Sequence, residues 1–114
     1  MEYEVVTEGG EKYAKRNTTP KSFEGWTKKK FEDQGYKVVR GDNKNNLPDW
    51  IASKEGTTIF IECKHYVTDT DVDKAFRKWK AKQSKQYEFQ KELSIYAKVY
   101  VVFRLKDKVV SIKL

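Results

Sequence analysis

The sequence predicts an α/β domain in which a mixed central β-sheet is flanked by α-helices. Three features predict it: two amphipathic segments with helix-start signals, several short runs rich in β-formers between them, and further runs of this kind near the C-terminal end. The expected order of elements is α-β-β-β-α-β-β. With 114 residues, the chain 1–114 is expected to form one domain with a modest core.

The N-terminal segment 1–17 is predicted to form an arm or a hairpin. Its residues alternate loosely in polarity around Glu8-Gly9-Gly10, which permits a hairpin turn. The same segment carries several basic side chains and would equally suit a flexible arm. The sequence leaves these two alternatives open.

The first helix is predicted from Pro20 to about Gln34. Thr18 and Thr19 offer a capping hydroxyl, and proline suits the first helical turn. Gly35 is the expected stop signal. The run 36–40 that follows is rich in β-formers and predicts the first core strand.

A β-hairpin is predicted over residues 49–64, with its turn at 54–57. Side chains alternate between faces along a strand, so Glu62 and Lys64 should point the same way and Cys63 the other way. Asp49 begins the partner strand and should reach the same end of the sheet. Charges placed on a sheet face are unfavourable unless a metal or a phosphate uses them.

A long helix is predicted over about 71–93, followed by strands at 97–104 and 109–113. The inner stripe of this helix is apolar as far as Trp79 and then turns polar. The polar members are Gln83, Gln86, Tyr87 and Gln90. This change indicates that the second half of the helix borders something hydrated.

The net charge favours a polyanionic partner. Lys and Arg total 24 against 17 Asp and Glu, which gives a formal charge of +7. A basic protein without a specific partner is the alternative. The single Cys excludes an intrachain disulfide and fits a reducing compartment. No apolar run reaches membrane-spanning length and no signal peptide is present, so a soluble, cytoplasmic protein without a membrane partner is expected.

The Pro-Asp pair at 48–49 and the Glu-x-Lys at 62–64 are separated by twelve residues, and this arrangement resembles the PD-(D/E)XK nuclease superfamily. Asp42-Asn43-Lys44 also matches Asp-x-Lys, but it lies in a polar stretch without strand character. Strand context therefore selects Glu62 and Lys64.

Hydrolysis of a phosphodiester needs an activated water and neutralisation of charge in the transition state. A Mg²⁺ ion held by carboxylate oxygens can supply both, and Mn²⁺ is expected to substitute. Asp49 and Glu62 are the predicted ligands, with the main-chain carbonyl of Cys63. Lys64 would orient or deprotonate the water, or stabilise developing charge. A surface salt bridge among Asp49, Glu62 and Lys64 is the alternative.

Within this superfamily, the sequence resembles the archaeal-type Holliday junction resolvases, which are dimeric nucleases. The resemblance covers about residues 20–104 and rests on Glu24, Gly35-Tyr36, the strand ending at Arg40, Asp49 and Glu62-Cys63-Lys64. It implies a restriction-endonuclease-like fold and a homodimer, with candidate dimer surfaces on the N-terminal segment and the outer positions of strand 97–104. By resemblance, Glu24 joins the metal site and Arg40 binds junction phosphate. Otherwise, Glu24 is a first-turn residue favoured by the helix dipole.

Two departures from the resolvase pattern keep other functions open. Gly25 stands where an Arg commonly follows the helix Glu, and Thr19-Pro20 where Lys-Gly is common. The leading hypothesis is a Mg²⁺-dependent endodeoxyribonuclease that resolves four-way junctions by paired nicks. The alternatives are a nuclease for flaps, ends or single strands, and a catalytically silent DNA-binding module. The predicted DNA contacts are Arg40, Lys28, Lys29 and Lys44; for the lysines, a solvated face is the alternative.

Overall fold

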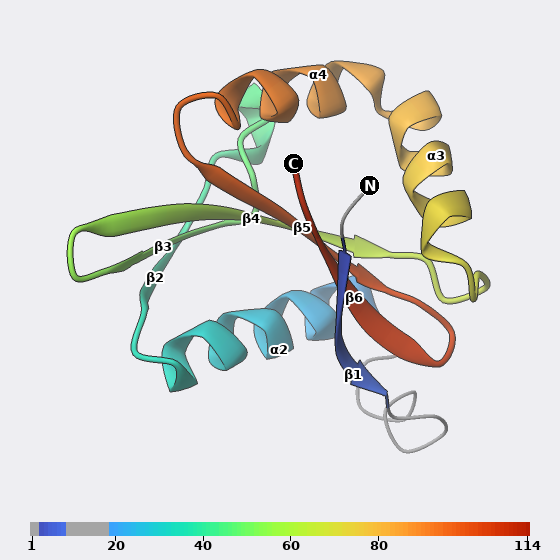
Figure 1. The fold of residues 1–114 in the computed structure, drawn as a ribbon, viewed down its shortest axis with the longest axis horizontal. Helices are drawn as coiled ribbons and strands as arrows, with labels where there is room; N and C mark the ends of the chain where they lie inside the picture. Colours follow the sequence, from blue (N-terminus) through green and yellow to red (C-terminus); the bar gives the residue numbers. More distant parts are fainter. Residues whose placement is uncertain (1–2, 9–18) are drawn as a thin grey trace.

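The computed structural model describes residues 3–8 and 19–114, which form a sheet with helices on both faces (Figure 1). In chain order the elements are β1 (Tyr3–Glu8), α2 (Pro20–Asp33), β2 (Lys37–Arg40), the 3₁₀ turn η1 (Asn43–Asn45), β3 (Trp50–Lys54), β4 (Thr57–His65), α3 (Val72–Lys82), α4 (Ser84–Leu93), β5 (Lys98–Arg104) and β6 (Lys108–Lys113). Among these residues, no helix is long and apolar enough to cross a membrane.

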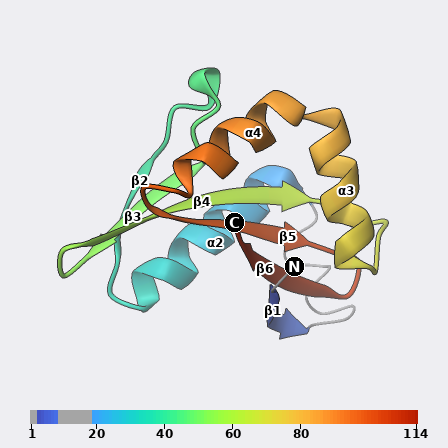
Figure 2. The same cartoon turned by 45° about the horizontal axis from the view of Figure 1, so that its top comes forward.

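The sheet has six strands in the order β1-β6-β5-β4-β3-β2. All neighbours pair antiparallel except β4 and β5, which are parallel and are joined by a crossover through α3 and α4. The sheet is therefore mixed, as the sequence predicts. Helix α2 covers one face, and α3 and α4 cover the other (Figure 1 and Figure 2).

Local signals set the bounds of α2 as predicted. Thr19 and Ser22 form a reciprocal capping box, and Pro20 occupies the first turn. The helix ends at Asp33, and Gly35 follows with a φ of +95°, a conformation that favours glycine. Phe23 and Thr27 are the buried residues of its inner face.

The core has two halves because the sheet is covered on both sides. On the α2 face, Phe23 packs with Trp50 and Ile61. On the other face, Trp79 packs with Val101 and Phe103. Strand β5 contributes to both halves and lies between β4 and β6, so the prediction of a dimer surface on strand 97–104 is wrong. Its apolar side chains are instead buried within the chain itself.

The predicted helix 71–93 is in fact two helices. Helix α3 ends at Lys82 and α4 begins at Ser84, and Gln83 between them has φ −127° and ψ 52°. Figure 2 shows that α3 and α4 cross the same face of the sheet in different directions. No Gly or Pro marks this break, so pattern reasoning extends the helix through it.

The N-terminal segment contributes a strand that the expected order lacks. Strand β1 pairs antiparallel with β6, from Tyr3 opposite Ile112 to Glu8 opposite Lys108, and forms an edge of the sheet. The observed order is thus β-α-β-β-β-α-α-β-β. The hairpin or arm is predicted over 1–17, and residues 1–2 and 9–18 lie outside the described residues.

Candidate active site

Asp49 lies beside the edge of β4, just beyond the point where β3 stops pairing with β4. The last pair of β3 and β4 is Trp50 opposite Ile61, and beyond it β4 continues beside β5 alone. At this edge the backbone N–H of Cys63 donates to Oδ2 of Asp49 at 2.8 Å. Asp49 is buried. The hydrogen bond therefore fixes one oxygen of its carboxylate against β4.

Gly41 permits the close approach that brings Asp49 to this edge. Its N–H donates to the Asp49 carbonyl at 2.8 Å. A Cβ atom at position 41 would lie 1.8 Å from the carbonyl oxygen of Pro48, so a larger residue would displace this segment. The glycine thus has a local role in positioning the Asp49 loop.

Glu62 and Lys64 point to the face covered by α3 and α4, on the same side of β4 as the alternation predicts. Glu62 is 2% exposed, and its Oε2 lies 3.2 Å from the Lys64 Nζ. Lys64 also donates to the Gln83 Oε1 at 2.8 Å and lies 5.6 Å from the centre of the Trp79 ring. The ion pair is largely shielded from water rather than a surface salt bridge.

The two carboxyl groups titrate abnormally because they are buried together. Burial, followed by the charge of Asp49, raises the pKa of Glu62 to about 7, against the opposing effects of Lys64 and Gln90. Burial also raises the pKa of Asp49, against the opposing hydrogen bond from Cys63. Both ionised forms are thus disfavoured in the protein alone, and a bound cation would favour them.

We expect the metal-free protein to lose stability as the pH rises through about 7. The pKa of Glu62 is about 7 in the folded state against 4.5 as the ordinary value, so between these values the folded state binds the extra proton. The contribution of Glu62 to the free energy of unfolding is complete below the ordinary pKa. It is about 3 kcal/mol smaller once the pH exceeds the pKa of the folded state. Denaturant unfolding in EDTA at about pH 5 and about pH 8 measures it. Glu62→Gln should remove most of this pH dependence; an unchanged dependence in the variant would contradict the assignment.

Trp50 organises a second group of charged side chains beside Asp49. Its Nε1 donates to the Glu24 carbonyl at 3.1 Å, and the Arg40 guanidinium lies 3.9 Å from the centre of its ring. Arg40 also donates to the Glu24 Oε1 at 2.6 Å. Lys28 lies 5.5 Å from the same ring. Glu24 is close enough that its charge contributes to the raised pKa of Asp49.

The remaining predicted DNA contacts lie apart from this cluster. Lys29 is exposed and pairs with Asp33 at 3.3 Å, farther around α2. Lys44 is exposed in η1, where its backbone N–H donates to Asp42. The structure therefore groups Arg40 and Lys28 near Asp49 and places Lys29 and Lys44 elsewhere.

The oxygen donors at the edge of β4 suit Mg²⁺. The N–H and the carbonyl of one residue point to the same edge of a strand, so the Cys63 carbonyl faces the edge where Asp49 lies. With Glu62, this gives hard oxygen donors of the kind Mg²⁺ prefers, and that ion usually retains several waters. Within residues 3–8 and 19–114, no three His, Cys, Asp or Glu side chains come close enough to hold a metal ion. Glu24, paired with Arg40, stays a predicted ligand.

Two glutamines that the sequence placed on the polar stripe, without a role in the site, contact its charged side chains. Gln83 and Gln90 face Lys64 and Glu62 of β4, so the inner stripe of the predicted helix turns polar beside these charged groups. Gln90 is 0% exposed and donates from Nε2 to the Glu62 Oε1 at 3.0 Å. Tyr87 instead packs against Phe76 and Trp79. The change from apolar to Gln at inward positions was the available signal.

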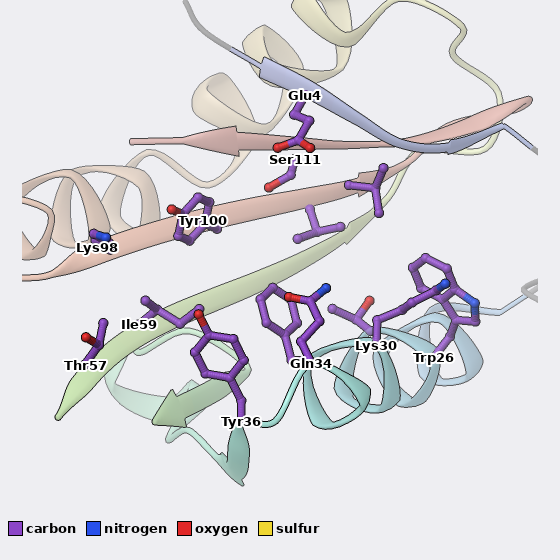
Figure 3. A pocket seen from close by; sticks show the side chains of 14 residues that line it. Glu4, Trp26, Lys30, Gln34, Tyr36, Thr57, Ile59, Lys98, Tyr100 and Ser111 are labelled. Carbon is purple, nitrogen blue, oxygen red and sulfur yellow. The ribbon is translucent and has the colours of Figure 1, made fainter. Parts of the chain in front are cut away.

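A pocket of about 280 Å³ lies elsewhere, between α2 and the sheet (Figure 3). Trp26 and Lys30 line it from α2, and Ile59 and Tyr100 line it from the sheet. Ile59 belongs to the core half that packs on α2, whereas Glu62 faces α4. The described residues that line this pocket include none of the predicted catalytic side chains, so it is separate from the candidate active site.

Comparison with known proteins identifies the family. The family model described as archaeal Holliday junction resolvase (Hjc) matches residues 15–108. The chain belongs to the Hjc family.

The solved structure of Archaeoglobus fulgidus Hjc, a Holliday junction resolvase from an archaeal hyperthermophile, has a TM-score of 0.51 with 18% identity, over 82% of this chain and 83% of that chain. At this identity the similarity shows the fold alone, and the fold matches the prediction. No curated protein gives a significant match. The Hjc family assignment also confirms the resemblance seen in the sequence.

Proposed function

We propose that this member of the Hjc family is a Mg²⁺-dependent endodeoxyribonuclease that resolves four-way DNA junctions by paired nicks. The observation that supports it best is the convergence of two buried carboxylates, Asp49 and Glu62, with Lys64 at the open edge of β4. A buried acidic pair of this kind is unfavourable for folding and is explained by a cation that it holds.

In this proposal, Asp49, Glu62 and the Cys63 carbonyl hold the metal. Glu24 would add a further ligand if its ion pair with Arg40 opened. When bound, Mg²⁺ supplies charge neutralisation at the phosphate and lowers the pKa of a bound water. Mn²⁺ has similar ligand preferences and should replace it.

The protein's own groups have separate roles. Lys64, held between Glu62 and Gln83, orients the attacking water or stabilises the charge that develops on the phosphate. The Arg40 side chain is 52% exposed, so its guanidinium can leave Glu24 and contact a DNA phosphate. Lys28 lies on the same side, and Lys29 and Lys44 would contact more distant parts of a junction.

Paired nicks in opposed strands require two active sites related by a twofold axis, so we propose a homodimer. Strand β1 offers a surface for a second chain. It lies at an edge of the sheet, and Tyr3, Val5 and Val6 on it are 52%, 42% and 43% exposed.

The test is cleavage of end-labelled four-way junction, flap, duplex and single-stranded DNA, in Mg²⁺ and in EDTA. The proposal expects symmetric paired nicks that are confined to the junction and disappear in EDTA. Cleavage spread over flaps or single strands would favour a general processing nuclease. Tight junction binding without cleavage in Mg²⁺ or Mn²⁺ would leave a silent DNA-binding module.

A further inference from the structure

Gln90 connects the two segments that carry the proposed metal ligands. It lies in α4, is fully buried, and donates from Nε2 to the Glu62 Oε1 at 3.0 Å. The same Nε2 makes a longer contact of 3.4 Å to the main-chain carbonyl of Asn46. Asn46 has a φ of 61° and precedes Asp49 by three residues in the loop. One amide group therefore lies between the β4 carboxylate and the loop that delivers the other carboxylate.

The orientation of this amide follows from its neighbours. Its Nε2 faces a carboxylate oxygen and a carbonyl oxygen, and both are acceptors. The reverse orientation would set the Gln90 Oε1 against those two oxygens, which is repulsive. The donor group therefore faces Glu62, and the amide oxygen makes neither of these two contacts.

That oxygen, Oε1, is buried and has no hydrogen-bond partner among the described residues. A buried acceptor is ordinarily satisfied, and exceptions call for an explanation by structure or function. A site for Mg²⁺ retains several waters, which are strong hydrogen-bond donors. The unused acceptor of Gln90 is thus suited to a water bound at this site.

We propose that Gln90 is a positioning residue of the metal site, which fixes the Glu62 carboxylate relative to the Asp49 loop and accepts a hydrogen bond from site water. This inference rests on the proposed Mg²⁺-dependent function. Partners of this kind, which hold a ligand without binding the metal, typically change metal affinity by about 10- to 100-fold when they are replaced. Gln90 acts through Glu62, so its replacement should alter metal binding more than DNA binding.

The test compares Gln90→Met with Gln86→Met. Gln86 lies one turn earlier in α4, and its Oε1 accepts from the Trp79 Nε1 at 2.8 Å, so the control also removes an amide hydrogen bond. Mn²⁺ binding to the DNA-free protein, measured by the loss of the free-ion electron paramagnetic resonance signal, gives the dissociation constant. Gln90→Met should raise it by about 10-fold or more, while Gln86→Met leaves it within about twofold. Both variants should still bind junction DNA in EDTA.

Equal Mn²⁺ affinities for the two variants would overturn the role of Gln90 and leave the proposed function intact. If the wild-type protein itself bound no Mn²⁺, or bound it equally well after Glu62→Gln, the proposed function would fail instead. Should Gln90→Met not fold, Gln90→Asn provides a second variant. It retains a buried amide that is one methylene too short to reach Glu62, and it should show the same weakening.

Discussion

Glu62→Gln and Asp49→Asn should each reduce junction cleavage by at least about 10³-fold and leave junction binding in EDTA nearly unchanged. Each change replaces one carboxylate oxygen by an amide nitrogen, which is not a ligand for Mg²⁺. The shape is retained, and the hydrogen bond from Gln90 can still reach an oxygen at position 62. Cleavage assays at saturating Mg²⁺, paired with a gel-shift assay of the junction, measure the two effects.

Measuring the stability of each variant tests whether unfolding causes the loss of cleavage. Because burial raises the pKa of Glu62 to about 7, its neutral isostere should be more stable than the wild type at about pH 8 without metal. A variant that is stable, binds the junction and does not cut it would support the metal site. Full cleavage by either variant would show that the replaced carboxylate is not a ligand of the proposed metal site.

Lys64→Met should reduce cleavage by about 10²- to 10⁴-fold while Mn²⁺ affinity is kept. Lys64 is a cation within 3.2 Å of Glu62, so its removal leaves the carboxylates more attractive to a metal, not less. The variant should therefore lose either the orientation of the attacking water or the stabilisation of the charge that develops on the phosphate. Single-turnover cleavage with a parallel Mn²⁺ titration separates chemistry from metal binding.

Lys54→Met is the matched control for charge. Lys54 ends β3, and its Nζ donates to the Gln34 carbonyl at 2.8 Å. The control removes one positive charge from the same hairpin and should cut at nearly the wild-type rate. If Lys64→Met lost Mn²⁺ binding instead, the principal role of Lys64 would be to hold Glu62 in place.

The sequence by itself determined the features that depend on near neighbours along the chain. The start of α2 follows from Thr19, Ser22 and Pro20, and its end from the positive φ of Gly35. Alternation along β4 places Glu62 and Lys64 on one face. The family resemblance followed from the order and spacing of Glu24, Asp49 and the Glu62-Cys63-Lys64 motif. The metal-binding and catalytic roles assigned to them stay predictions.

The tertiary structure decided what depends on residues far apart in the sequence. Strand β1 exists because β6, about a hundred residues later, offers it an edge, and no local pattern encodes that pairing. The break at Gln83 coincides with its hydrogen bond to Lys64, and the burial of Gln90 with its hydrogen bond to Glu62. A glutamine on a helix is ordinarily exposed, and only the opposing charged group of β4 makes its burial favourable.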